Sequence, residues 1–160
     1  MGSVTARLGQ PTDCRPPFKF SALTRVGFSD TDAQGIVYYG RYLPYFDLAR
    51  VEYERHLGVL DLEVGQEEFV TRASTVLYEA PARFDDLLEV FVRTKKIGRT
   101  SMTNSYCAVR VDDDVLLCTA EQTLVLVSVA ERRPTPVPEG YRRTIAAFEG
   151  ADLELAVPVE

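Results

Sequence analysis

The sequence has little of what metal sites, disulfide frameworks and membrane spans require. Its 160 residues include one histidine and three cysteines. Cys14, Cys107 and Cys118 are irregularly spaced and form no CxxC pair, so they indicate neither a disulfide framework nor a zinc site. No run of about 18 apolar residues is present, and the N-terminus lacks the basic-then-apolar pattern of a signal peptide. We therefore expect a cytoplasmic protein without a metal, a cofactor or a membrane span.

Positive charge is also scarce. Twenty-four acidic residues against eighteen basic ones give a net charge of −6, and this balance disfavours binding to nucleic acid or to anionic lipid. Apolar residues make up 46% of the chain, the ordinary proportion of a globular protein. Length and composition together predict one folded domain.

The first part of the chain has three sections. Residues 1–17 are rich in Gly, Ser, Thr and Pro and predict a flexible leader. Apolar residues then alternate with polar ones over residues 18–28, the period of a half-buried strand. Spacings of three and four over residues 40–56 predict a long helix, and Gly58 is a natural stop for it. The apolar face of this helix carries Tyr42, Phe46, Ala49, Tyr53 and Leu57.

The rest of the chain is strand-like. Four segments are rich in β-branched and aromatic residues and are separated by turn-forming residues: 69–78, 87–97, 100–111 and 115–129. Residues 139–148 predict a short helix that closes a domain over 18–148, and residues 149–160 a frayed tail. The order indicates an α+β protein in which an antiparallel sheet of about five strands wraps around one long helix. Because such a sheet leaves edges exposed, we expect at least a dimer.

Two carboxylates lie where the first strand leads into the helix. Asp30 and Asp32 precede the free N–H groups of the helix, which can stabilise an oxygen that becomes negative during a reaction. An acid that faces these groups can attack the same carbon or activate water to attack it. Two alternatives stay open: these acids cap the helix, or the D-x-D pair holds a cation, for which no third ligand is evident.

This segment resembles the hotdog-fold acyl-CoA thioesterases of the 4-hydroxybenzoyl-CoA thioesterase family. The resemblance rests on VGFSDTDAQGIVYY at residues 26–39, followed by Tyr42 and residues 46–50. YEAPARFDDL at residues 78–87 is similar to the family's link into its next long strand, and PVP at residues 136–138 to its closing segment. The resemblance implies a hotdog fold over about residues 20–138.

It also implies site residues. Asp32 takes the position of the family's catalytic carboxylate, acting as general base or nucleophile, and Asp30 takes the supporting position. Tyr39 corresponds to the position whose backbone N–H polarises the thioester carbonyl, with Gly40 beside it. Some bacterial members have a histidine at the Tyr39 position, which this sequence lacks; its only histidine, His56, lies at the end of the predicted helix and is interpreted as structural.

Substrate contacts follow from the same resemblance. Lys96, Arg99 and Thr100 are expected to bind coenzyme A, although a hairpin tip is also often basic because it is solvated. Tyr42 and Phe46 are candidates for the acyl pocket, although such a stripe on a helix is more often plain core. Glu121, within an apolar strand, is interpreted as an edge or solvent-facing charge and is left out of the site.

The predicted function is hydrolysis of acyl-CoA to a free acid and CoA by a dimer or tetramer. One alternative is a thioesterase for acyl-carrier proteins of a fatty-acid or polyketide pathway, for which Arg132, Arg133, Arg142 and Arg143 are a candidate docking patch. Another is a non-catalytic acyl-binding hotdog protein. Dehydratases and hydratases of the fold are disfavoured because they usually combine a carboxylate with a histidine. A G-x-S-x-G element is absent from the sequence, which argues against an α/β-hydrolase triad.

Overall fold

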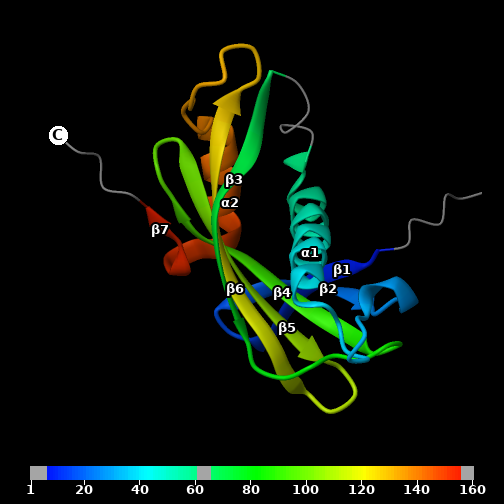
Figure 1. The fold of residues 1–160 in the computed structure, drawn as a ribbon. Coiled ribbons are helices and arrows are strands. Elements are labelled where there is room, and N and C mark those ends of the chain that lie inside the picture. Colours follow the sequence, from blue (N-terminus) through cyan, green and yellow to red (C-terminus); the bar gives the residue numbers. More distant parts are fainter. Residues whose placement is uncertain (1–6, 61–65, 156–160) are drawn as a thin grey trace, which may run out of the picture.

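A computed structural model describes residues 7–60 and 66–155 of the chain. One sheet of seven strands carries the long helix α1 on one face (Figure 1). The strands are β1 (Gly9–Arg15), β2 (Phe18–Arg25), β3 (Glu67–Tyr78), β4 (Leu87–Ile97), β5 (Ser101–Arg110), β6 (Val115–Ser128) and β7 (Glu154–Leu155). The helices are α1 (Tyr42–Leu57) and α2 (Glu139–Glu149), with short 3₁₀ turns η1 (Phe28–Asp30), η2 (Tyr39–Arg41) and η4 (Gly150–Asp152).

The predicted α+β architecture is confirmed. The strands follow the order β1-β2-β4-β5-β6-β3 and pair antiparallel, while the short β7 pairs parallel with β4. The four segments rich in β-branched and aromatic residues match β3, β4, β5 and β6 within about two residues, whereas the alternation over residues 18–28 extends three residues beyond the end of β2. The predicted count of about five strands is too low, since β1 and β7 also belong to the sheet.

α1 provides the centre of the core. Tyr42, Phe46, Ala49 and Tyr53 are buried, as the spacing predicted, together with Tyr45 and Glu54. Gly58 ends the helix with φ of 72°, and its N–H donates to the carbonyl oxygen of Arg55. A positive φ is a conformation that favours glycine, which explains why the helix stops there.

The expected leader over residues 1–17 is corrected by the structure. Residues 9–15 form β1, which pairs antiparallel with β2 through Gly9↔Ala22 and Pro11↔Phe20. A Cβ atom at Gly9 would lie 2.6 Å from the Phe20 ring, so glycine lets the two strands approach. β1 escaped prediction because its sequence, GQPTDCR, has no alternation of apolar and polar residues. Residues 1–6 lie outside the described part of the chain.

The expected frayed tail over residues 149–160 is also partly wrong. Glu149 is fully buried, η4 follows it, and β7 pairs with Lys96 and Ile97 of β4. An ion pair of 2.7 Å between Lys19 Nζ and Asp152 Oδ2 fastens this segment to β2. Residues 156–160 lie outside the described residues. No helix in the described part of the chain is long and apolar enough to cross a membrane.

Glu149 occupies a gap at the edge of β4, between the part that pairs with β2 and the part that pairs with β7. Its Oε1 accepts hydrogen bonds from the Tyr53 hydroxyl at 2.7 Å and from the Thr94 N–H at 3.2 Å. No described group donates to Oε2, which is also buried. Burial therefore raises the pKa of Glu149 above its usual value of 4.5, despite the two donors that lower it.

This burial predicts a specific pH dependence. Because the folded state holds the proton more tightly than the unfolded chain does, the Glu149 contribution to the free energy of unfolding falls as pH rises from about 4.5 through the raised pKa. Urea unfolding between pH 4 and 8 measures it, with Glu149→Gln as the comparison. The wild-type stability minus that of the variant should decrease with pH; a flat difference would contradict this assignment.

Candidate active site

Asp30 fixes the connection between β2 and α1. Its Oδ2 accepts hydrogen bonds of 2.8 Å from the Gly27 N–H and from the Tyr45 hydroxyl, and its Oδ1 lies 3.4 Å from Arg41 Nε. Burial and the hydrogen bond to Asp30 together raise the pKa of Tyr45, so its hydroxyl keeps its proton as a donor. Because Asp30 already has three partners, it holds the loop in place rather than facing a substrate.

Asp32 lies in a tight turn that leaves part of its carboxylate unoccupied. Its Oδ1 accepts a hydrogen bond of 2.8 Å from the Gln34 N–H, and its own N–H donates to the Ile36 carbonyl oxygen at 2.9 Å. Gly35 makes the turn possible with φ of 77°. No described residue donates a hydrogen bond to Asp32 Oδ2, so that oxygen is available for a ligand or for water.

Asp32 lines a cavity of about 380 Å³, hereafter the Asp32 cavity. The walls come from the β2–α1 connection, the start of α1, the end of β3 and the residues that follow it. They consist of Asp32, Gln34, Ile36, Val37, Tyr39, Tyr42, Tyr78, Glu79, Ala80 and Pro81. Three tyrosines give the cavity an aromatic wall, with ring-centroid distances to Tyr78 of 5.8 Å from Tyr42 and 6.4 Å from Tyr39.

The turn η2 presents free backbone donors next to this cavity. Among the described residues, no oxygen accepts a hydrogen bond from the N–H of Tyr39 or Gly40, as is usual for the first amides of a helix. The Tyr78 hydroxyl donates to the Tyr39 carbonyl oxygen at 2.9 Å and so fixes the turn against β3. A Cβ atom at Gly40 would lie 2.9 Å from the Tyr38 ring, which explains the glycine.

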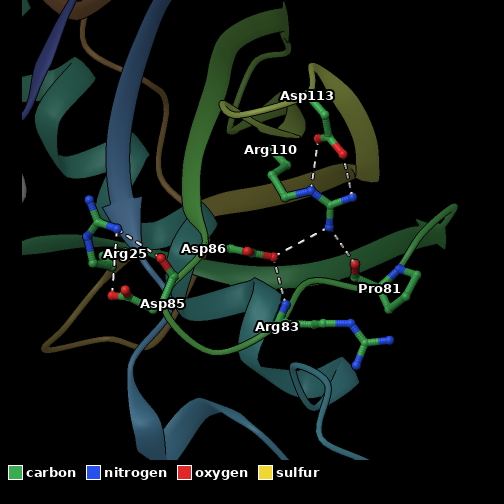
Figure 2. A network of polar contacts seen from close by, with 7 residues as sticks. All are labelled: Arg25, Pro81, Arg83, Asp85, Asp86, Arg110 and Asp113. Atoms are coloured by element: carbon green, nitrogen blue, oxygen red, sulfur yellow. Dashed lines mark hydrogen bonds and ion pairs between the residues drawn. The ribbon is translucent and has the colours of Figure 1, made fainter.

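Arg110, at the end of β5, holds the loop that carries Pro81 (Figure 2), and Pro81 lines the cavity. Its guanidinium binds both carboxylate oxygens of Asp113, at 2.9 and 3.0 Å, and donates to the Pro81 carbonyl oxygen at 3.0 Å. The same group lies 3.4 Å from Asp86 Oδ2, which accepts a hydrogen bond of 2.8 Å from the Arg83 N–H. The loop that carries Pro81 is thus held at several points.

A second arginine fastens the far end of this loop. Arg25, the last residue of β2, donates to the Asp85 carbonyl oxygen at 2.8 Å and lies 3.6 Å from Asp85 Oδ1 (Figure 2). Sequence reasoning missed both arginines, because their partners in this loop lie 24 to 60 residues away in the chain. The signal that was present is the sequence RFDD, which places Asp85 and Asp86 within the segment 78–87 that resembles the family.

The predicted acyl-pocket residues lie in different surroundings. Tyr42 lines the Asp32 cavity, whereas Phe46 is fully buried in the core and stacks on Tyr106 at 4.9 Å. Burial raises the pKa of Tyr42 to about 12, so this hydroxyl stays neutral in the cavity wall. Tyr39 also lines the cavity, and Gly40 follows it in η2.

The predicted coenzyme A contacts lie far from the cavity of the same chain. Lys96, Arg99 and Thr100 are at the β4–β5 turn, whereas the loop of Pro81 leads into the opposite end of β4. The eleven residues of β4 span roughly 35 Å at about 3.3 Å per residue. One chain therefore does not bring these residues together with Asp32.

Other predicted residues have local roles in the structure. Arg142 donates to the carbonyl oxygens of Gly98 and Arg99, so its guanidinium holds the β4–β5 turn and is not free for a docking patch. His56 lies in the last turn of α1, with its ring 5.4 Å from that of Phe20, in agreement with a structural role. Glu121 is exposed and pairs with Lys95 at 2.6 Å, as expected for a solvent-facing charge.

In the described part of the chain, no group of three or more His, Cys, Asp or Glu side chains is arranged to hold a metal ion. Asp30 and Asp32 do not form a cation site, because Asp30 is bound to Gly27, Tyr45 and Arg41. The groups at the cavity are the carboxylates of Asp32 and Glu79, the unpaired amides of η2 next to it and an aromatic wall.

Comparison with known proteins identifies the family. Residues 26–145 match the thioesterase-like superfamily. The chain belongs to this superfamily. It is 35% identical over 117 residues to the acyl-CoA thioester hydrolase YbgC of Escherichia coli, covering 72% of this chain and 87% of the relative. It is 32% identical over 132 residues to the acyl-CoA thioesterase YbgC of Haemophilus influenzae, covering 81% and 93%.

Solved structures show the same fold. The structure of Slr0204, a 1,4-dihydroxy-2-naphthoyl-CoA thioesterase from Synechocystis, superposes with a TM-score of 0.73 at 20% identity, over 81% of this chain and 96% of that one. At this identity the likeness concerns the fold alone. The resemblance to hotdog-fold thioesterases inferred from the motif at residues 26–39 is thus confirmed, with the fold it implied.

Arg110 and Arg25 both hold the loop of residues 81–86, but they should contribute differently to the free energy of unfolding. Arg110→Ala removes half-buried hydrogen bonds to charged groups, and should lower the free energy of unfolding by about 1–3 kcal/mol. Arg25→Ala breaks a more exposed pair, which should cost about 0–1 kcal/mol. Chemical denaturation of both variants compares them. Equal losses in the two variants would show that Arg110 does not clamp the loop.

Proposed function

We propose that the protein is a thioester hydrolase that cleaves acyl-CoA to a free acid and CoA, with Asp32 as the catalytic carboxylate. The observation that carries this proposal is that Asp32, with an unoccupied oxygen, and the turn with the unpaired Tyr39 and Gly40 amides border one cavity. A carboxylate and a pair of amide donors are the two groups that attack on an acyl carbon requires. The two relatives described above are named acyl-CoA thioester hydrolase and acyl-CoA thioesterase, which supports the substrate class.

The reaction follows from these groups. The thioester carbonyl oxygen accepts hydrogen bonds from the Tyr39 and Gly40 amides, and Asp32 removes a proton from a water molecule that attacks the carbonyl carbon. The tetrahedral intermediate carries its negative charge on the oxygen at the amides. The carbon–sulfur bond then breaks, and the thiolate takes up the proton that Asp32 received. A thiolate is a good leaving group, so a carboxylate is a sufficient base.

A direct attack by Asp32 uses the same geometry. In that route the carboxylate oxygen forms a mixed anhydride with the acyl group, the thiolate leaves, and water hydrolyses the anhydride. A single turnover in water enriched in ¹⁸O tests for the anhydride. Heavy isotope in the Asp32 carboxylate shows that an anhydride formed and that water opened it at the Asp32 carbonyl carbon, whereas attack by water on the thioester places the isotope only in the product acid.

The Asp32→Asn variant tests the role of this residue. The amide oxygen of asparagine can still accept the hydrogen bond from the Gln34 N–H, so the turn should persist while the base is lost. We expect kcat for thiol release from acyl-CoA to fall by roughly 10²–10⁴-fold. Asp112→Asn, in the exposed β5–β6 turn, is the matched control and should retain wild-type kcat. Full activity of Asp32→Asn would exclude Asp32 as the catalytic residue.

We also propose that two copies of the chain form the complete site. β3 is an edge strand of twelve residues that pairs on one side with β6. Its apolar side chains include Val70, Leu77 and Tyr78, which are 44%, 58% and 48% exposed, an arrangement that favours pairing with a second copy. The separation of Lys96 and Arg99 from Asp32 within one chain supports the same view: a partner's β4–β5 turn is free to supply the cations for the phosphates of coenzyme A.

Association through β3 is tested by placing a charge on this strand. Val70→Asp should shift the protein from a dimer or tetramer toward monomer and lower its activity, because a buried unpaired charge opposes association. Val111→Asp is the control, since Val111 is 45% exposed and lies at the β5–β6 turn. Light scattering after size-exclusion chromatography gives the mass. A wild-type monomer with full activity at all concentrations would contradict the two-copy site.

A further inference from the structure

The Asp32 cavity contains a second carboxylate, that of Glu79. This residue directly follows β3, and its N–H donates to the Leu117 carbonyl oxygen at 2.8 Å, so its backbone is fixed to β6. The preceding residue, Tyr78, packs its ring on Tyr42 in the cavity wall. Glu79 lines the cavity and is solvent-exposed, as expected for a side chain at its mouth. The mechanism described above gives it no role.

Glu79 lies beside the buried part of β6. Tyr78 pairs with Cys118 in the β3–β6 register, so Glu79, which follows Tyr78, lies next to Leu117 and Cys118 in space. Burial, and after it the nearby groups of Cys107 and Glu79, raise the pKa of the Cys118 thiol to about 12. The carboxylate of Glu79 is therefore close to the wall that Tyr42 and Tyr78 form.

Little positive charge offsets this carboxylate. Among the described residues that line the cavity, none is a lysine or an arginine. Arg110 is close to the Pro81 loop, but Asp113 and Asp86 already pair with its guanidinium. Asp32 and Glu79 together therefore give the cavity a negative potential, in surroundings that are otherwise aromatic and aliphatic.

We propose that Glu79 determines the charge specificity of the site: it selects neutral acyl groups and rejects acyl groups that carry a second carboxylate. This inference rests on the proposed function, since it concerns the acyl group of the thioester. Two like charges about 6 Å apart in a partly solvated site repel one another enough to change affinity roughly ten- to a hundredfold. Apolar and aromatic walls select for shape but do not discriminate a carboxylate from a methyl group so strongly.

The experiment compares two acyl groups of equal length, adipoyl and hexanoyl, as thioesters of N-acetylcysteamine. This thiol carries no phosphate, so any effect of charge comes from the acyl group. The measured quantity is the ratio of kcat/KM for adipoyl to kcat/KM for hexanoyl. Glu79→Gln should raise this ratio about tenfold or more, and the wild-type ratio should rise with salt as the repulsion is screened.

Two further variants separate charge from structure. Glu79→Asp keeps the carboxylate and should keep a ratio close to that of the wild type. Glu131→Gln makes the same substitution in the turn after β6, on an exposed residue outside both the cavity and β3, and should leave the ratio unchanged. An unchanged ratio in Glu79→Gln would overturn the proposal. If kcat/KM rose equally for both acyl groups, the ratio would also be unchanged, and Glu79 would act on the thiol or on catalysis instead.

Binding of non-hydrolysable adipoyl and hexanoyl thioether analogues tests charge selection by Glu79 separately from hydrolysis. It therefore distinguishes a failure of this proposal from a failure of the proposed function. If the wild type hydrolyses neither thioester, hydrolysis is the wrong reaction, and calorimetry with the two analogues still measures the selectivity. The ratio of their dissociation constants should change about tenfold in favour of adipoyl in Glu79→Gln. The same ratio in variant and wild type would show that Glu79 does not determine charge specificity.

Discussion

The hydrogen bonds of the Asp30 carboxylate are the contacts on which the site depends. They join the Gly27 amide, two residues after the end of β2, to the Tyr45 hydroxyl in the first turn of α1. A chain that leaves a strand and enters a helix has many conformations available, and a partly buried, charge-assisted pair of hydrogen bonds selects one of them. Asp32 and η2 lie between these two anchors, so their relative position follows from this selection.

Long-range contacts complete the cavity. Its second wall comes from the end of β3 and the loop after it, which Arg110 fixes from the end of β5 and Tyr78 fixes through the Tyr39 carbonyl oxygen. The catalytic carboxylate that we propose and the amides come from one local segment, whereas the shape of the cavity depends on strands distant in sequence. The carboxylate of Glu79 lies on this second wall, apart from the segment of Asp32.

The sequence predicted those parts of the fold whose signals are local. The segments over 87–97 and 115–129 are rich in β-branched and aromatic residues, and the face of Tyr42 and Tyr53 has the period of a helix; the structure places these elements within about two residues of the expected bounds. β1 and β7 were missed because their pairing depends on backbone hydrogen bonds to an edge and not on an apolar pattern. The motif around Asp32 is also a local signal, and its residues line the Asp32 cavity, whereas the clamp by Arg110 was evident only from the tertiary structure.

The most direct measurement of the central claim is a structure of the protein with a bound, non-hydrolysable acyl thioether analogue. The account predicts that the oxygen in the place of the thioester carbonyl lies within about 3 Å of the Tyr39 and Gly40 amide nitrogens. It also predicts that Asp32 Oδ2 faces the adjacent carbon, directly or through one water molecule. An analogue bound away from η2, with Asp32 turned into solvent, would contradict the account.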